Sequence, residues 1–216
     1  MKKAWFAAIL LTLGAAGAAM GATVTYRKET TGATTLTIPV VKGVNKAANE
    51  AVNAALASMV REEVKALADD VEAKELIIRG KAELLEGALL SFSFEGMVYF
   101  QGAAHPSSDR LGATFDALSG KKISLEELFL PETNWQEILD AWLFQVIDQQ
   151  VAGEEIMVFD DDYPYLSEYA DQFFLRPGEL VFFWTDTQFT PHASGQPEFV
   201  VPRFVVEHLL RPEYTF

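Results

Sequence analysis

The feature that most constrains the fold is the alternation of apolar and polar side chains from Leu89 to Phe100. Apolar residues fall on every second position, which is the period of a β-strand with one buried face. A second alternation runs from Leu111 to Ala117, and Ile123 and Leu125 follow the Ser119-Gly120 pair. The stretch that ends at Phe129 therefore predicts a strand, a loop, a strand, a turn and a further strand.

The loop between the first two of these strands spans residues 101–106 and ends in a proline. Gly102 gives the backbone freedom for a tight turn, and Pro106 cannot donate to a β-ladder. His105 lies between them, and its imidazole could act as a base or a ligand. A histidine that bonds the loop carrying it needs no chemistry, so a structural role is the preferred interpretation.

Two amphipathic helices flank this stretch. Apolar residues recur every three or four positions over Val44–Ala68 and again over Asn134–Gln149, which is the pattern of a helix with one buried stripe. Trp142 and Leu143 belong to the stripe of the second helix, so both are expected to be buried.

Further strands are predicted at Leu36–Val40, Leu76–Leu85, Phe173–Leu175, Leu180–Asp186 and Glu198–Val201. The short turns at Glu86-Gly87, Ser119-Gly120 and Pro177-Gly178 favour antiparallel pairing, because parallel neighbours need crossovers of a dozen or more residues. The sequence thus predicts an α+β fold, in which a mostly antiparallel sheet carries the two amphipathic helices.

Three expectations concern the edges and the centre of this fold. Thr23–Thr35 is polar and is predicted to be a loose start, and Pro202–Leu210 is predicted to be a closing helix. The strand at Leu180–Asp186 is apolar on both faces, which is typical of a central strand covered twice.

Residues 1–21 resemble a secretory signal peptide. Lys2 and Lys3 precede the apolar run Ala4–Leu13, and small residues follow up to Ala22. The apolar run is shorter than the roughly 20 residues that cross a bilayer. We therefore expect a single periplasmic or secreted domain over residues 22–216, with no membrane span in the mature chain.

The charge of the chain narrows the classes of partner. The formal net charge is -14, and without Lys2 and Lys3 the 17 basic residues fall to 15 against 31 acidic ones, which gives -16. Such a surface repels nucleic acid and anionic lipid and would favour a basic partner, although solubility alone is the preferred explanation of the charge. The chain has no cysteine, so neither disulfides nor thiolate metal sites are available.

No catalytic residue, metal site or cofactor follows from the residues themselves. The histidines His105, His192 and His208 lack zinc-ligand spacing. Asp160–Asp162 lacks the alternating ligands of a calcium loop, so a solvated acidic loop is expected. An enzyme would need His105 and an acid such as Asp116 to converge in a pocket.

Aromatic residues near the carboxyl end offer another kind of site. Strand periodicity assigns most of them to the core, but Tyr163, Tyr165 and Trp184 would serve as stacking surfaces for a sugar if they were exposed.

Several motifs together resemble a known family. They are Tyr99–Pro106, Phe115–Phe129, Gly178-x-Leu180, Pro191–Glu198 and Ile38-Pro39 with Val44-Asn45. The first two are similar to the Tyr-x-Gly-Gly-Ala-His-Pro and Asp-x-x-(Thr/Ser)-Gly-Lys patterns of an uncharacterised extracytoplasmic domain. That domain occurs in the sensor region of lysozyme-binding anti-sigma factors and beside the catalytic domain of certain peptidoglycan deacetylases. Ala103 stands where the second glycine of the pattern is usual.

The resemblance implies an α+β domain outside the cytoplasm that binds a component of the cell envelope without catalysis. A basic protein such as lysozyme and peptidoglycan are the two expected partners. The alternatives are an accessory glycan-binding module and an envelope hydrolase that uses His105. The candidate binding residues are Gly102, His105, Asp116, Tyr163, Tyr165 and Trp184.

Overall fold

The computed structural model describes residues 21–43, 45–68, 73–159 and 163–216. The leader, apart from Gly21, and the acidic run Asp160–Asp162 lie outside these residues. Within them, no helix is both long and apolar enough to span a membrane.

The larger of two sheets has six strands in the order in which they follow one another along the chain. They are β1 (Thr23–Thr31), β2 (Thr34–Lys42), β3 (Ala73–Glu86), β4 (Leu89–Phe100), β5 (Ser107–Asp116) and β6 (Lys122–Ile123). All neighbours pair antiparallel except β2 and β3. These two are parallel because the helix α1 (Lys46–Ala68) carries the chain back across the sheet between them.

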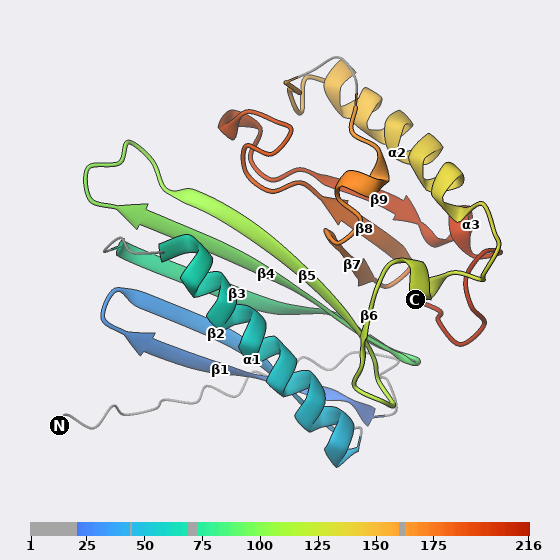
Figure 1. Ribbon diagram of the computed structural model, residues 1–216, viewed down its shortest axis with the longest axis horizontal. Coiled ribbons are helices and arrows are strands. Elements are labelled where there is room, and N and C mark those ends of the chain that lie inside the picture. Colours follow the sequence, from blue (N-terminus) through green and yellow to red (C-terminus); the bar gives the residue numbers. More distant parts are fainter. Residues whose placement is uncertain (1–20, 44, 69–72, 160–162) are drawn as a thin grey trace.

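The smaller sheet has three antiparallel strands, with β8 at its centre. They are β7 (Phe173–Arg176), β8 (Glu179–Phe183) and β9 (Glu198–Pro202). The second long helix, α2 (Trp135–Ala152), packs beside it (Figure 1). Four short helices complete the described fold: η2 (Glu126–Leu128), η3 (Leu166–Glu168), η4 (His192–Ser194) and α3 (Arg203–Val206).

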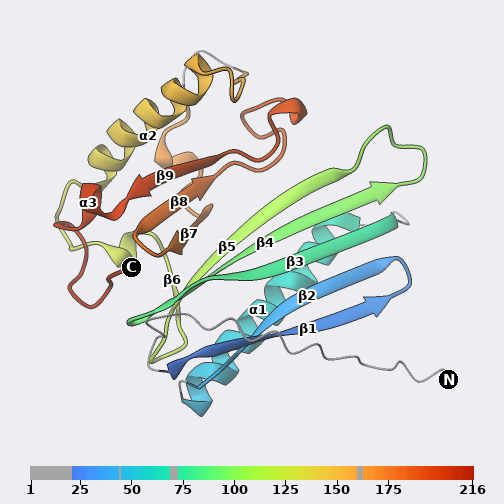
Figure 2. The same cartoon turned by 180° about the vertical axis from the view of Figure 1, so that it is seen from behind.

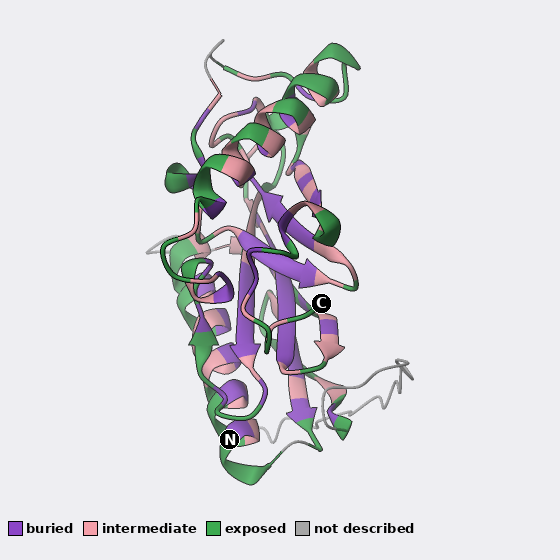
Figure 3. Ribbon diagram, turned by 90° about the vertical axis from the view of Figure 1, so that its right-hand side faces the viewer, coloured by how far each residue is buried: buried purple, intermediate pink, exposed green. Residues whose placement is uncertain are grey.

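The layers follow from the alternation along each strand. Phe92 and Phe94 of β4 point to the side of α1, where they share a core with Val52, Leu56 and Val60. The other face of the large sheet meets the small sheet through β7, which contacts β3, β4 and β5. The opposite face of the small sheet packs on α2, and Figure 3 shows the buried residues concentrated in the strands between the two helices.

The two sheets approach each other closely at Gly112 of β5. A side chain at this position would overlap the carbonyl group of Phe173 in β7. Beside it, the backbone N–H of Leu175 donates to Ser91 Oγ over 2.9 Å, and Ser91 Oγ lies 2.9 Å from Thr114 Oγ1. A glycine and two hydroxyls therefore let the two sheets approach to backbone contact at this point.

Charged side chains also join the sheets. Glu198 of β9 accepts hydrogen bonds from Arg110 of β5 and from Arg176 of β7, at 2.7 to 2.9 Å. Arg176 lies 3.5 Å from Glu83 of β3 as well. Burial would raise the pKa of Glu198, but the hydrogen bonds and charges of the two arginines outweigh it and hold the pKa below its ordinary value.

The predicted α+β class, with mostly antiparallel pairing and two main helices, is confirmed. The strand predicted from Leu89 to Phe100 has those bounds, and hairpin turns occur at Gly87 and Gly178. The strands are divided between two sheets, however, where the sequence suggested one.

Two expectations about the chain ends are wrong. Thr23–Thr31 is a full strand, because its β-branched threonines favour extended backbone and pair with β2 along the whole length. The closing helix α3 has only four residues. It stops early because the following chain bonds to the segment before α2, where Leu130 N donates to Leu209 O and Arg211 N donates to Leu128 O.

Candidate functional site

The candidate residues at the two ends of β5 are far apart. Gly102 and His105 lie in the exposed loop before β5, and Gly102 has the positive φ of 86° that the turn requires. Asp116 ends the strand, about 30 Å away for ten extended residues. It accepts hydrogen bonds from the backbone N–H and the hydroxyl of Ser119, at 2.7 and 2.6 Å. Asp116 therefore closes a turn, and the pairing with His105 that an enzyme would need is not formed.

The three aromatic candidates have different surroundings. Trp184 is fully buried, so it cannot offer a surface to a ligand. Tyr165 is 59% exposed, and its ring contacts Phe144 at 5.3 Å between centroids. Tyr163 is partly buried and lies 6.3 Å from Phe144, with its hydroxyl 3.4 Å from a carboxylate oxygen of Asp148.

His105 meets a residue that the sequence did not place beside it. Its ring stacks on that of His192, with the centroids 4.1 Å apart and the planes inclined by 20°. Nδ1 of His105 lies 3.2 Å from the carbonyl oxygen of Pro106, so the imidazole also bonds its own loop. The loop after β4 and the loop after β8 are joined by this pair of rings.

His192 is oriented by a carboxylate. Its Nδ1 lies 2.7 and 2.9 Å from the two carboxylate oxygens of Asp186, and Nδ1 must be the donor because a carboxylate only accepts. Ser108 Oγ donates to Asp186 over 3.3 Å. Asp186 is nearly enclosed while His192 is partly exposed, so Nε2 of His192 remains as the polar atom that can reach a partner.

An exposed apolar segment borders the second of these loops. Met157 N donates to Ser194 Oγ over 3.0 Å, and Phe159 N donates to the carbonyl oxygen of Phe189 over 3.0 Å. The side chains of Met157 and Phe159 are each 58% exposed. We call the surface formed by His105, His192, Met157 and Phe159 the loop face.

Among the described residues, no group of three or more His, Asp or Glu side chains is arranged to hold a metal ion. The loop face offers imidazole nitrogens and exposed apolar side chains. Exposed Met and Phe side chains of this kind are enriched in protein interfaces.

A second feature near this end of the sheet is a pair of carboxyl groups on the α1 side. Glu63 of α1 is 5% exposed, and its Oε1 has no hydrogen-bond partner in the part of the chain that the structure describes. Burial raises the pKa of Glu63 to about 7, and the charge of Asp109 adds to the shift. Burial also raises the pKa of Asp109, against the lowering effect of the Arg110 N–H, and the charge of Asp186 raises it further. Gly96 leaves the space that Glu63 occupies.

This buried carboxyl should make stability depend on pH. Because folding raises the pKa of Glu63, the folded chain holds its proton more tightly than the unfolded chain, and stability falls as pH rises from about 4.5 to about 7. Glu63→Gln should remove about 1–3 kcal/mol of the difference in unfolding free energy between pH 5 and pH 8, as measured by urea unfolding. Glu62→Gln, at the exposed neighbouring position, should leave the difference unchanged. An unaltered pH profile in Glu63→Gln would refute the assignment.

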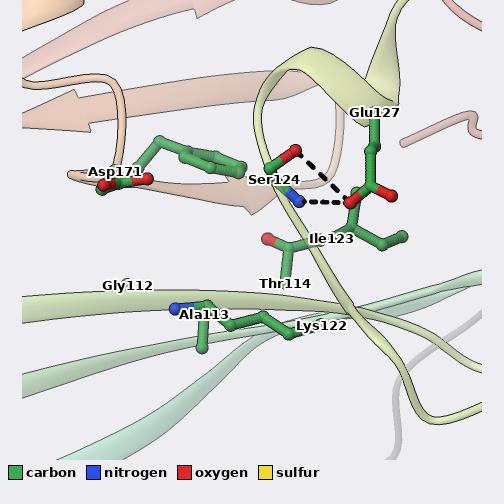
Figure 4. Close-up of a pocket in the computed structure, with 9 residues that line it drawn as sticks. Gly112, Ala113, Thr114, Lys122, Ile123, Ser124, Glu127 and Asp171 are labelled. Carbon is green, nitrogen blue, oxygen red and sulfur yellow. Dashed lines mark hydrogen bonds between the residues drawn. The ribbon is translucent and has the colours of Figure 1, made fainter.

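A small cavity lies where β5 and β6 meet β7 (Figure 4). It measures about 220 Å³, below the usual range for a ligand site. Figure 4 shows Glu127 on one side, held by Ser124 N and Ser124 Oγ at 3.0 and 3.3 Å, and Asp171 on the other. Lys121 also bonds Glu127, and its hydrogen bond lowers the pKa of that carboxyl.

Sequence reasoning missed His192 and Asp186 as members of one site with His105. The available signal was the motif Pro191–Glu198, which contains His192. Nothing in the linear sequence indicates that this motif and Tyr99–Pro106 share one surface.

Comparisons with known proteins place this fold in a family context. Residues 126–203 match the family model DUF3298, described as a protein of unknown function. A solved member of the DUF3298 family from Bacteroides fragilis NCTC 9343 is 17% identical, with a TM-score of 0.60 over 89% of this chain and 94% of that chain. A DUF3298 family protein from Pseudomonas aeruginosa PAO1 is 16% identical, with a TM-score of 0.54 over 95% and 96%. The comparison with curated proteins gives no match. Residues 126–203 are thus similar to the DUF3298 family model, and the chain has the fold of these two DUF3298 structures.

Proposed function

We propose that this chain is a non-catalytic binding domain of the cell envelope, periplasmic or secreted, whose loop face contacts a basic protein such as lysozyme. The observation that carries the proposal is the stacking of His105 on His192 at 4.1 Å. It brings together two motifs of the family resemblance that lie far apart in the sequence.

The surroundings of these rings suit a protein partner. Met157 and Phe159 add exposed apolar surface beside the histidines, and the centre of a protein interface is typically apolar with aromatic and Met side chains. The net charge of -14 would attract a basic protein and raise its association rate.

Retention of lysozyme on the immobilised protein tests the proposal, at low and at moderate salt. Phe159→Ala should weaken binding about tenfold or more, because exposed aromatic residues near an interface centre contribute most to affinity. Phe204→Ala is a matched control, because it removes an exposed phenylalanine that is not part of the loop face. Phe204 is 67% exposed and packs on Trp142, and its replacement should leave binding unchanged. Absence of retention even at low salt would exclude lysozyme, and equal losses in both variants would exclude the loop face.

Peptidoglycan is the second candidate partner, and the exposure of Tyr165 favours it. The exposed ring of Tyr165 packs on the partly buried ring of Phe144, and an exposed aromatic ring can stack on sugars. Sedimentation with peptidoglycan, repeated with Tyr165→Ala, separates this glycan-binding role from protein binding. Sedimentation that is unaffected by Tyr165→Ala would refute a role of this ring.

A further inference from the structure

A wedge opens in the face of the large sheet that α1 does not cover. The strands β2 and β3 pair only over Thr34–Thr37 and Leu76–Arg79, and the two hairpins diverge beyond these residues (Figure 2). A cavity of about 410 Å³ lies here, within the range of small-ligand sites. Its lining comes from four strands: Tyr26, Thr37, Arg79, Gly80, Lys81, Ser93 and Glu95.

Tyr26 links the two hairpins across the wedge. The N–H of Ala82 in β3 donates to the hydroxyl of Tyr26 in β1 over 3.2 Å. The Tyr26 hydroxyl therefore accepts a hydrogen bond from the backbone of β3 where the two hairpins diverge. Its own proton can still be donated to a ligand.

The charges around the wedge leave one cation without a counterion. Glu83 binds Lys81 at 2.8 Å and lies 3.5 Å from Arg176. The two other carboxylates of this group, Glu95 and Glu198, are bound by Arg110 and Arg176. The guanidinium of Arg79 is exposed and has no ion pair or hydrogen bond to any side chain among the described residues.

An unpaired arginine at a concave site is informative in a chain of net charge -14. A guanidinium presents parallel N–H donors that match a carboxylate in a bidentate geometry. Lys81 lies two residues from Arg79 on the same face of β3, which is about 7 Å along a strand. The hydroxyls of Tyr26 and Thr37 stand across the wedge and suit the polar groups of a small ligand.

We propose that this wedge binds a small organic carboxylate, with Arg79 holding the carboxylate and Tyr26 and Thr37 hydrogen-bonding the rest of the ligand. The site lies outside the loop face and does not depend on the protein partner proposed for that face. A sugar acid and an acidic amino-acid residue present the same group, so both are tested.

Isothermal titration calorimetry with two matched pairs of probes tests the site. N-acetylmuramic acid differs from N-acetylglucosamine by a lactyl group that carries the carboxylate, and N-acetyl-glutamic acid α-amide differs from N-acetyl-glutamine amide by its one carboxylate. The acid of at least one pair should bind at least tenfold more tightly than its neutral partner. The pair that shows the difference tells whether the bound carboxylate belongs to a sugar acid or to an acidic amino-acid residue.

Two variants locate the binding. Arg79→Gln should weaken binding of that acid about tenfold or more, since a charge-assisted hydrogen bond is lost. Arg61→Gln removes the same charge from the exposed surface of α1, on the other side of the sheet, and should leave affinity unchanged. The proposal is overturned if neither acid binds at millimolar concentration, if acid and neutral probes bind alike, or if both variants weaken binding equally. Equal unfolding temperatures of the two variants check that both are folded.

Discussion

Replacing Gly112 with alanine is expected to lower the free energy of unfolding by about 3 kcal/mol or more. The added methyl group would overlap the carbonyl oxygen of Phe173 and stand 2.7 Å from its carbonyl carbon. Because β5 and β7 belong to different sheets, relief of this overlap must move the sheets apart. That movement would also lengthen the hydrogen bond from Leu175 N to Ser91 Oγ. One methyl group thus disturbs the whole contact between two layers.

Urea unfolding followed by tryptophan fluorescence measures this effect. Gly153→Ala adds the same methyl group at the end of α2, where φ is -79° and the nearest heavy atom would be 3.2 Å away. This control should change stability by less than about 1 kcal/mol. Equal unfolding midpoints for Gly112→Ala and the unaltered chain would show that the sheets do not approach as described.

Trp184→Ala should destabilise the fold by about 3–5 kcal/mol. The indole is fully buried and is surrounded by Phe199, Phe189 and Tyr169, with ring centroids 4.4, 5.1 and 5.9 Å away. Such a loss is a large share of the roughly 5–15 kcal/mol that stabilises a domain. No disulfide is available to offset it, since the chain has no cysteine.

Thermal and urea unfolding of Trp184→Ala and Trp142→Ala, measured side by side, test this assignment. Trp142 is only partly buried, although its Nε1–H donates to the carbonyl oxygen of Val200 over 3.0 Å. Trp142→Ala should therefore lower the free energy of unfolding by less than Trp184→Ala does. A larger loss in Trp142→Ala would mean that the centre of this core has been misplaced.

The comparison of these two tryptophans shows what the sequence could and could not predict. The helical period correctly indicated α2, and Trp135, Leu139, Leu143 and Ile147 are buried at steps of four residues. Trp142 precedes Leu143 by one residue, or about 100° around the helix, so it lies on the flank of the buried stripe. Trp184 directly follows β8, whose residues are buried on both faces. The apolar character of that strand was a better guide to the burial of Trp184 than the ability of an indole to stack on a sugar.

Local periodicity was sufficient for single elements and insufficient for the arrangement of sheets. The alternation from Leu89 to Phe100 predicted β4 with its observed bounds, because the buried face is visible in every second residue. The division into two sheets depends on contacts such as Gly112 with Phe173, between residues distant in the chain. A glycine in a strand can mark the close approach of another backbone segment, but the sequence does not show which segment that is.

In the candidate site too, the local features were predictable from the sequence and the long-range contacts were not. The loop that holds Gly102 and His105 was predicted from glycine and proline, which act locally. The stacking of His105 on His192 requires the loops that follow β4 and β8 to meet, which is a property of the fold as a whole. Arg79 gave no signal at all, since an unpaired arginine in the sequence is indistinguishable from a paired one.

The direction of the strands gives the domain a polarity. The last residue of β1, Thr31, aligns through Thr34 and Leu76 with the end of β4, where the loop that carries His105 begins. The first residue of β1, Thr23, pairs with Lys42 and therefore lies at the opposite end of the sheet. Phe216 is buried near the β3–β4 turn, with Thr215 close to Gly87. Both described ends of the chain therefore lie toward one pole and the loop face toward the other. A tether or surface attached at either end would leave His105 and His192 pointing outward.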